Sequence, residues 1–174
     1  MISSFAHCKE QLEDGNLAVL PAETVYGLAA NGIDPVAVKK IFSLKGRPPT
    51  NPVILHVSNI KDAYKYAFID ENAEKLAQHF WPGPLTLILK KRDIVPEIAT
   101  ADLSTVGIRS PSNAIFRKML TSLSFPLAAP SANPSNRTSP TSASQVLEMF
   151  GHSCPPILDD GPTELGIEST ILDL

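Results

Sequence analysis

Short apolar runs alternate with stretches of helical periodicity along this chain, and that alternation restricts the fold more than any other feature of the sequence. The apolar runs predict strands at 17–20, 52–57, 85–89, 104–109, 125–129, 157–158 and 166–173. The periodic stretches predict helices at 4–14, 34–45, 60–66, 71–80, 113–123 and 142–150, and no element is predicted for 90–101. Strands that alternate with helices predict an α/β domain with a mainly parallel or mixed sheet.

The length and composition indicate one globular domain over residues 1–174. No apolar run reaches the roughly 18 residues that a membrane-spanning helix needs, and 1–11 lacks the basic start and apolar middle of a signal peptide. The two cysteines, Cys8 and Cys154, lie far apart without metal-ligand spacing and are predicted to be buried or incidental thiols. These features predict no membrane association and a place in the reducing cytoplasm.

Charge is distributed unevenly, although the net charge is only −3. Residues 35–61 and 103–147 contain no acidic residue. The cations inside these windows are Lys39, Lys40, Lys45, Arg47 and Lys61 in the first, and Arg109, Arg117, Lys118 and Arg137 in the second. The windows predict local positive potential in an acidic protein, with solvated helix faces as the alternative.

The segment Lys45-Gly-Arg-Pro-Pro-Thr-Asn-Pro inside the first window is suited to holding an anion. A lysine in the last turn of a helix is explained by the helix dipole alone. Arg47 is not explained in this way, because it follows Gly46 and precedes two prolines that restrict the backbone. His56 ends the next strand, where a histidine is more often structural than catalytic.

Polar loops at 21–27, 45–56, 104–111 and 130–140 follow predicted strands, and in open α/β sheets ligands collect at such ends. Glu23, Thr24 and Tyr26 are candidates in the first loop, and the third carries Arg109. The fourth loop is rich in hydroxyl and amide side chains and stiffened by proline, which favours a phosphate or ribose cradle over a disordered linker.

The chain has no Walker or dinucleotide glycine pattern and no spacing that argues for a nucleophile with an activating base. Cations among hydroxyls and amides favour chemistry that depends on positioning and charge stabilisation, such as phosphoryl or nucleotidyl transfer. Arg109 is suited to a carboxylate, which guanidinium binds bidentately. Binding of RNA or another anion without catalysis remains the alternative.

Six segments together resemble the YrdC/TsaC family of threonylcarbamoyl-AMP synthases: 21–28 (PAETVYGL), 45–52 (KGRPPTNP), 81–86 (WPGPLT), 107–111 (GIRSP), 129–133 (APSAN) and 168–173 (ESTILD). The resemblance implies a YrdC-like α/β fold, with a twisted mixed sheet around a positively charged concave cavity. It implies the reaction of L-threonine, bicarbonate and ATP to threonylcarbamoyl-adenylate and pyrophosphate, the first step of the tRNA modification t6A at position 37. A non-catalytic binder of double-stranded RNA or tRNA with the same fold remains the alternative.

The resemblance also implies roles for particular residues. Lys45 and Arg47 would act in catalysis by offsetting charge on the phosphates, together with Mg²⁺ that accompanies ATP. The implied ATP side contains Arg47, Asn51, Thr105, Ser131 and Ser139. The implied threonine side contains Thr24, His56, Arg109, Ala129 and Ser169. No protein ligand to a metal is assigned, and the implied later partners are tRNA and the proteins that transfer the threonylcarbamoyl group.

The sequence departs from the family pattern at two places. Asn136 stands where the family usually has glycine, and asparagine tolerates left-handed backbone angles better than most residues. Family members usually continue beyond the last strand to an Arg-x-Gly segment, so a shortened chain or a naturally short member is expected here.

Overall fold

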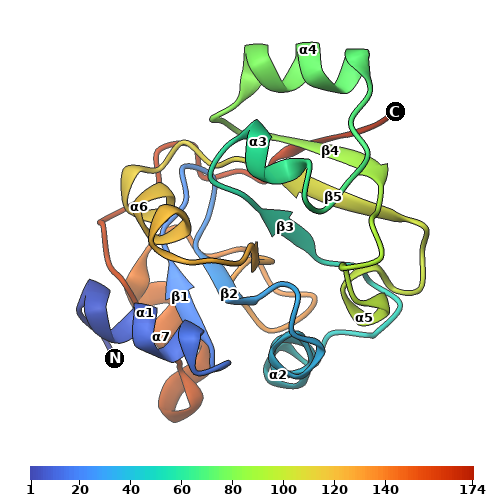
Figure 1. The fold of residues 1–174 in the computed structure, drawn as a ribbon. Helices are drawn as coiled ribbons and strands as arrows, with labels where there is room; N and C mark the ends of the chain where they lie inside the picture. Colours follow the sequence, from blue (N-terminus) through green and yellow to red (C-terminus); the bar gives the residue numbers. More distant parts are fainter.

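The structure, a computed structural model, describes all residues from 1 to 174, and its seven strands form one sheet with helices around it (Figure 1). The strands are β1 (Ala18–Leu20), β2 (Gly27–Asn31), β3 (Ile54–His56), β4 (Leu85–Lys90), β5 (Thr105–Arg109), β6 (Leu127–Ala128) and β7 (Thr170–Asp173). The helices are α1 (Phe5–Glu13), α2 (Pro35–Lys45), α3 (Ile60–Ala63), α4 (Glu71–Phe80), α5 (Glu97–Thr100), α6 (Ala114–Ser122), α7 (Ala143–Phe150) and the 3-10 helix η1 (Gly151–Ser153). The predicted α/β class is confirmed.

The sheet is mixed, as predicted, with the strand order β1-β2-β6-β3-β5-β4-β7. The pairs β3–β5 and β4–β7 are parallel, and all other neighbouring pairs are antiparallel. In the parallel pair, His56 is the register partner of Arg109. The pairing therefore brings the ends of two predicted site loops together.

Helix starts follow the expected capping chemistry, with one exception. The hydroxyl of Ser4 accepts a hydrogen bond from His7 N, and the Asp34 carboxylate accepts one from Val36 N. The range 113–123 predicted for α6 would make Ser112 its N-cap, and that placement is wrong. Asn113 is the N-cap, because its Oδ1 accepts a hydrogen bond from Phe116 N at 2.9 Å.

The largest difference from the predicted elements is β2, which the sequence pattern does not indicate. Its residues, Gly-Leu-Ala-Ala-Asn, are small and nearly all buried, so they show no alternation of polar and apolar positions. The pair at 157–158 contributes only isolated bridges through Ile157. The region 90–101, left without an element, contains α5.

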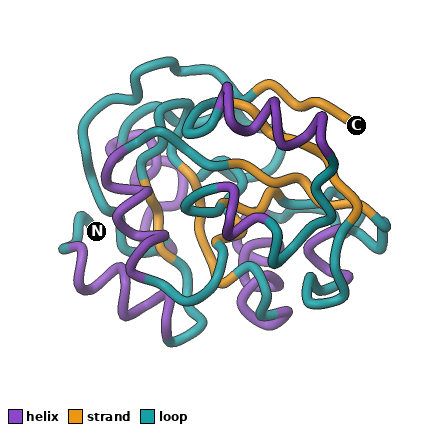
Figure 2. Tube along the Cα trace, turned by 45° about the horizontal axis from the view of Figure 1, so that its top comes forward, coloured by secondary structure: helices purple, strands orange, loops and turns teal.

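Two hydrophobic clusters stabilise the sheet, one of 29 and one of 12 buried residues. Helices lie around the strands in Figure 2, while β7 is an exposed edge strand near the C-terminus. The thiol of Cys8 is buried in the smaller cluster, where burial raises its pKa to about 11. None of the helices has the length and apolar character needed to cross a membrane.

Candidate functional site

Two adjoining cavities contain most of the polar residues predicted for the site. The Arg47 cavity, of about 330 Å³, is lined by Arg47, Asn51, Pro52, Val53, Ile54, Ile88, Gly107, Pro130, Ser131, Glu168, Ser169 and Ile171. The Arg109 cavity, of about 50 Å³, is lined by Ala22, Thr24, Val25, Gly27, Ile54, His56, Arg109, Phe116, Ala129, Pro130, Ser131, Glu168 and Ser169. Both cavities share Ile54, Pro130, Ser131, Glu168 and Ser169, so the two spaces meet at these residues.

The floor of the Arg47 cavity is a face of the sheet, and not only a set of strand ends as the sequence suggested. Ile54, Gly107 and Ile88 are register partners across β3, β5 and β4. A Cβ atom at Gly107 would lie 3.3 Å from side-chain atoms of Ile54, Ile88 and Thr86. The missing side chain therefore leaves the floor of the cavity open at its centre.

Arg47 lies at the rim of this cavity, just after the end of α2. Gly46 ends the helix with a φ of 58°, which turns the chain toward the cavity. Arg47 Nε donates to Asn51 O at 3.0 Å, and its Nη2 donates to Asn51 Oδ1 at 2.8 Å and to Pro52 O at 2.7 Å. These bonds hold the guanidinium in place and leave Nη1 without a partner in the chain. Burial lowers the pKa of Arg47, and nearby Glu168 raises it in part.

Lys45 lies behind the cavity wall and lines neither cavity. Its Nζ donates to Ser131 O, to Asn133 O at 2.6 Å and to Asn133 Oδ1 at 3.4 Å. The ammonium is buried, and desolvation lowers its pKa to about 8. The ammonium thus binds the loop after β6. Its implied contact with phosphates stays a prediction.

Arg109 forms a buried ion pair at the end of β5. Its Nη2 donates to Glu23 Oε1 at 2.5 Å and to Thr24 Oγ1 at 3.1 Å, and its Nε donates to Gly83 O at 3.3 Å. Arg109 and Glu23 are each about 4% exposed. An acid from outside the acid-free window therefore balances this arginine, while its Nη1 makes no hydrogen bond within the chain.

His56 lies beside Arg109 and lines the same cavity. Its ring stacks on Phe116 of α6, with ring centroids 5.1 Å apart. Burial, and then the charge of Arg109, lower the pKa of His56 to about 3, so the imidazole is neutral at neutral pH. Its Nδ1 is buried and has no hydrogen-bond partner. The residue thus combines a packing role with a polar surface in the cavity.

The remaining predicted residues divide into three groups. Asn51, Thr24, Ala129, Ser131 and Ser169 line a cavity. Ser139 does not, but its hydroxyl donates to Glu168 Oε1, which does. Thr105 lines neither, because it begins β5, at the opposite end of the strand from Arg109. Tyr26 is also outside, since its hydroxyl bonds Asp159 and the carbonyl oxygen of Gly161.

Backbone conformation explains one departure from the family pattern. Asn136 adopts a φ of 65°, in the left-handed region that favours glycine and that asparagine tolerates. The loop after β6 is closed by Asn133, whose Nδ2 donates to Arg137 O at 2.6 Å. The asparagine therefore permits the turn that the family usually forms with glycine.

Sequence reasoning missed Glu168 and Phe116 as lining residues. Glu168 is the acid of the segment Glu-Ser-Thr-Ile-Leu-Asp, and it is the carboxylate that lines both cavities. An acid beside two hydroxyls in a predicted site segment was the available signal. Phe116 gave none, because an aromatic residue on a helix face normally indicates core packing.

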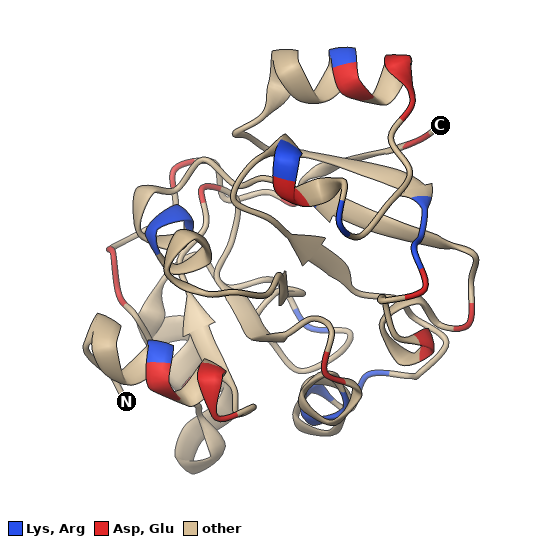
Figure 3. Ribbon diagram, viewed as in Figure 1, with Lys and Arg blue, Asp and Glu red and all other residues tan.

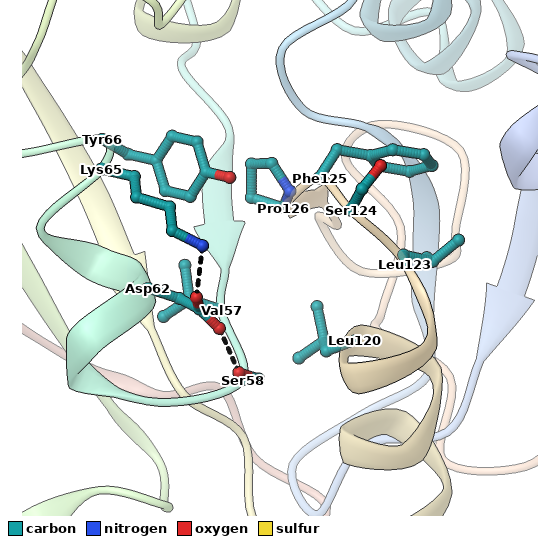
Figure 4. A pocket seen from close by; sticks show the side chains of 10 residues that line it. All are labelled: Val57, Ser58, Asp62, Lys65, Tyr66, Leu120, Leu123, Ser124, Phe125 and Pro126. Carbon is teal, nitrogen blue, oxygen red and sulfur yellow. Dashed lines mark hydrogen bonds and ion pairs between the residues drawn. The ribbon is translucent and has the colours of Figure 1, made fainter.

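A third pocket, of about 60 Å³, lies between α3 and the segment that follows α6 (Figure 4). Its charged side chains, Asp62 and Lys65, pair with each other at 2.7 Å, and Ser58 also bonds Asp62. The pocket shares no lining residue with the two cavities. It is therefore separate from the candidate site.

Fold and site together define an α/β domain with a divided polar cleft, one part lined by a rim arginine and the other by a buried arginine. Residues 10–174 match the Sua5/YciO/YrdC family, whose description reads "Telomere recombination". The chain belongs to this family.

Related proteins agree with this assignment. The chain is 48% identical to a threonylcarbamoyl-AMP synthase from Pyrococcus abyssi over 94% of its own length and 48% of the relative's. It is 42% identical to a threonylcarbamoyl-AMP synthase from Bacillus subtilis, over 92% of its own length and 47% of the relative's. The crystal structure of P. abyssi Sua5 complexed with L-threonine superposes with a TM-score of 0.95 at 46% identity, covering 98% of this chain and 50% of that one. The chain spans about half the length of these relatives.

Proposed function

We propose that this chain joins L-threonine, bicarbonate and ATP into L-threonylcarbamoyladenylate with release of pyrophosphate. The observation that carries the proposal is the junction of two arginine-lined cavities through five shared residues. An amino acid in one cavity and a nucleotide in the other would meet at that junction. The names of the relatives and the threonine in the P. abyssi Sua5 structure support this choice of ligands.

In this proposal the threonine amine and bicarbonate condense to a carbamate and water. A carbamate oxygen then attacks the α-phosphorus of ATP, and pyrophosphate leaves. Arg109 would orient the threonine carboxylate through its free Nη1, and Thr24 and His56 would complete that side. Arg47, fixed by Asn51, would offset the negative charge that gathers on the phosphates. The reaction needs no side-chain nucleophile, which agrees with the lack of an activated one.

Magnesium would accompany ATP as the ion that neutralises phosphate charge. The chain holds no group of three or more His, Cys, Asp or Glu side chains that could bind a metal ion by itself. At nucleotide sites magnesium is usually held by phosphates and water with one or two protein oxygens. The oxygen donors nearest to such an ion would be Glu168, Ser131 and Ser169.

We propose that the product is used for the t6A modification at position 37 of tRNA. Further proteins would transfer the threonylcarbamoyl group to the tRNA, and the reaction would take place in the cytoplasm. The resemblance of the whole site to the family supports this step. No observation favours the alternative of a non-catalytic RNA binder. The net charge of −3 also gives the chain no general affinity for a phosphate backbone.

The experiment is pyrophosphate release with L-threonine, bicarbonate, ATP and Mg²⁺. Release is expected only when L-threonine is present. Arg109→Lys should raise the threonine KM on the order of tenfold or more, because one ammonium group cannot keep the bonds to Glu23, Thr24 and Gly83 and also donate to the carboxylate. Lys75→Ala on the exposed helix α4 serves as the matched control and should leave the rate unchanged. Release that is independent of threonine, or none from the intact chain, would refute the proposal.

A further inference from the structure

Glu168 is the carboxylate that both cavities share, and beyond its place near the metal ion the proposed reaction gives it no contact with the amino acid. Ser139 donates to its Oε1 at 2.5 Å. The only hydrogen bond of this side chain is through Oε1, and the residue is exposed, so Oε2 is accessible to a ligand. The carboxylate is thus held on one side and free on the other.

The negative charge of Glu168 is not neutralised by an ion pair with any of the nearby cations. Neither Lys45 nor Arg47 forms an ion pair with it, although its charge raises the pKa of both. Arg47 donates instead to Asn51 and Pro52. Arg109 pairs with Glu23 and not with Glu168, although both line the same cavity.

The Arg109 cavity therefore presents opposite charges that do not pair with each other. Arg109 belongs to the part that the Arg47 cavity does not share, whereas Glu168 lies at the junction. A zwitterionic amino acid fits this arrangement in one direction only. Its carboxylate meets the arginine, and its ammonium group meets the glutamate.

We propose that Glu168 binds the α-ammonium group of the amino-acid substrate and so points the amine toward the nucleotide cavity. The inference rests on the proposed function and adds the residue that sets the direction of the substrate. Once the ammonium group has lost a proton to solvent, the amine at the junction and bicarbonate condense to the carbamate and water beside the phosphates, without rotation of the bound amino acid. With the opposite direction, the amine would lie against Arg109, which repels it.

The test compares L-threonine with 3-hydroxybutanoate, which is threonine without its amino group, by ligand-observed NMR in the absence of nucleotide, bicarbonate and metal. Glu168→Gln keeps the oxygen that accepts from Ser139 but removes the charge. It should weaken L-threonine binding on the order of 10- to 100-fold, as expected for a lost charge-assisted hydrogen bond, and leave 3-hydroxybutanoate binding unchanged. Glu164→Gln, from the same exposed segment but outside both cavities, is the control and should bind both ligands as the intact chain does.

Each result decides the question. Unchanged L-threonine binding by Glu168→Gln, or equal losses for both ligands, would overturn the inference. A variant that keeps its threonine affinity but binds ATP with Mg²⁺ more weakly would assign Glu168 to the metal and also overturn it. If the intact chain binds no L-threonine at all, the proposed function itself fails, and the inference fails with it.

Discussion

At the scale of single residues, the two arginines of the site have different surroundings. Arg109 is buried in an ion pair with Glu23, and removal of one partner from such a pair costs several kcal/mol because the other charge stays unpaired. Arg47 lies at a rim, where carbonyl and amide oxygens hold it. Substitutions of Arg109 should therefore change both ligand binding and the stability of the fold, whereas substitutions of Arg47 should change mainly ligand binding.

His56 makes the stability of the fold depend on acid. Its pKa is about 3 in the folded chain and 6.5 in the unfolded chain, so between these values the unfolded state binds one more proton. The free energy of unfolding should fall as pH drops from 6.5 toward 3, by up to about 1.4 kcal/mol per pH unit from this residue. Urea denaturation at several pH values measures the free energy of unfolding of the intact chain and of His56→Gln. This free energy should change less steeply with pH in the variant than in the intact chain.

The exposed residue His7, on α1, supplies the control for this measurement. His7→Gln should retain the slope of the intact chain, since it replaces an exposed histidine that belongs to neither buried cluster. Equal slopes for His56→Gln and the intact chain would contradict the assignment of acid sensitivity to His56.

At the scale of elements, Lys45 joins the end of α2 to the loop after β6. Its ammonium satisfies the carbonyl oxygens of Ser131 and Asn133, and its own carbonyl accepts from Ser135 N at 2.8 Å. Ser131 lines both cavities. A loop held in this way should affect the binding of both proposed substrates, whereas a simple phosphate contact would affect ATP alone.

Lys45→Met separates these two roles. If Lys45 holds the loop, the variant should raise the KM for both L-threonine and ATP and lower the free energy of unfolding by about 2 kcal/mol, because buried carbonyl groups lose their donor. Steady-state kinetics and urea denaturation measure the two effects. Lys40→Met removes a lysine of the same helix that bonds Gly15 and Asn16, and both KM values should stay unchanged. A rise confined to the KM for ATP would identify a phosphate contact.

The elements also show what the sequence could predict. Strong periodicity predicted most strands and helices, and proline and glycine marked the loops that surround the site. The pattern could not predict β2, because small buried residues give no alternation. It also could not predict that Gly107 lies at the floor of a cavity or that Thr105 lies at the far end of β5 from Arg109, since both depend on the pairing of β5 with its neighbours.

At the scale of the whole molecule, charge is balanced by contacts between distant parts of the chain. Figure 3 shows Lys and Arg without acids on α2, in agreement with the sequence windows, while acids lie on other elements. Glu23 and Glu168 nevertheless reach the site from outside those windows. Sequence windows therefore overstate how basic the cleft is, because folding brings acids to it from other segments.

The shared wall of the two cavities predicts that L-threonine and ATP bind with positive coupling. Each ligand at about 100 times its Kd should stabilise the fold by roughly 2.7 kcal/mol, which corresponds to a rise in Tm of roughly 5 to 10 °C for a chain of this size. Both together should exceed the sum, because an ammonium group at the junction would lie near the phosphates and attract them. Thermal unfolding with each ligand and with both measures this, and adenosine in place of ATP should remove the excess. Strict additivity would mean that the two cavities bind independently, despite their five shared residues.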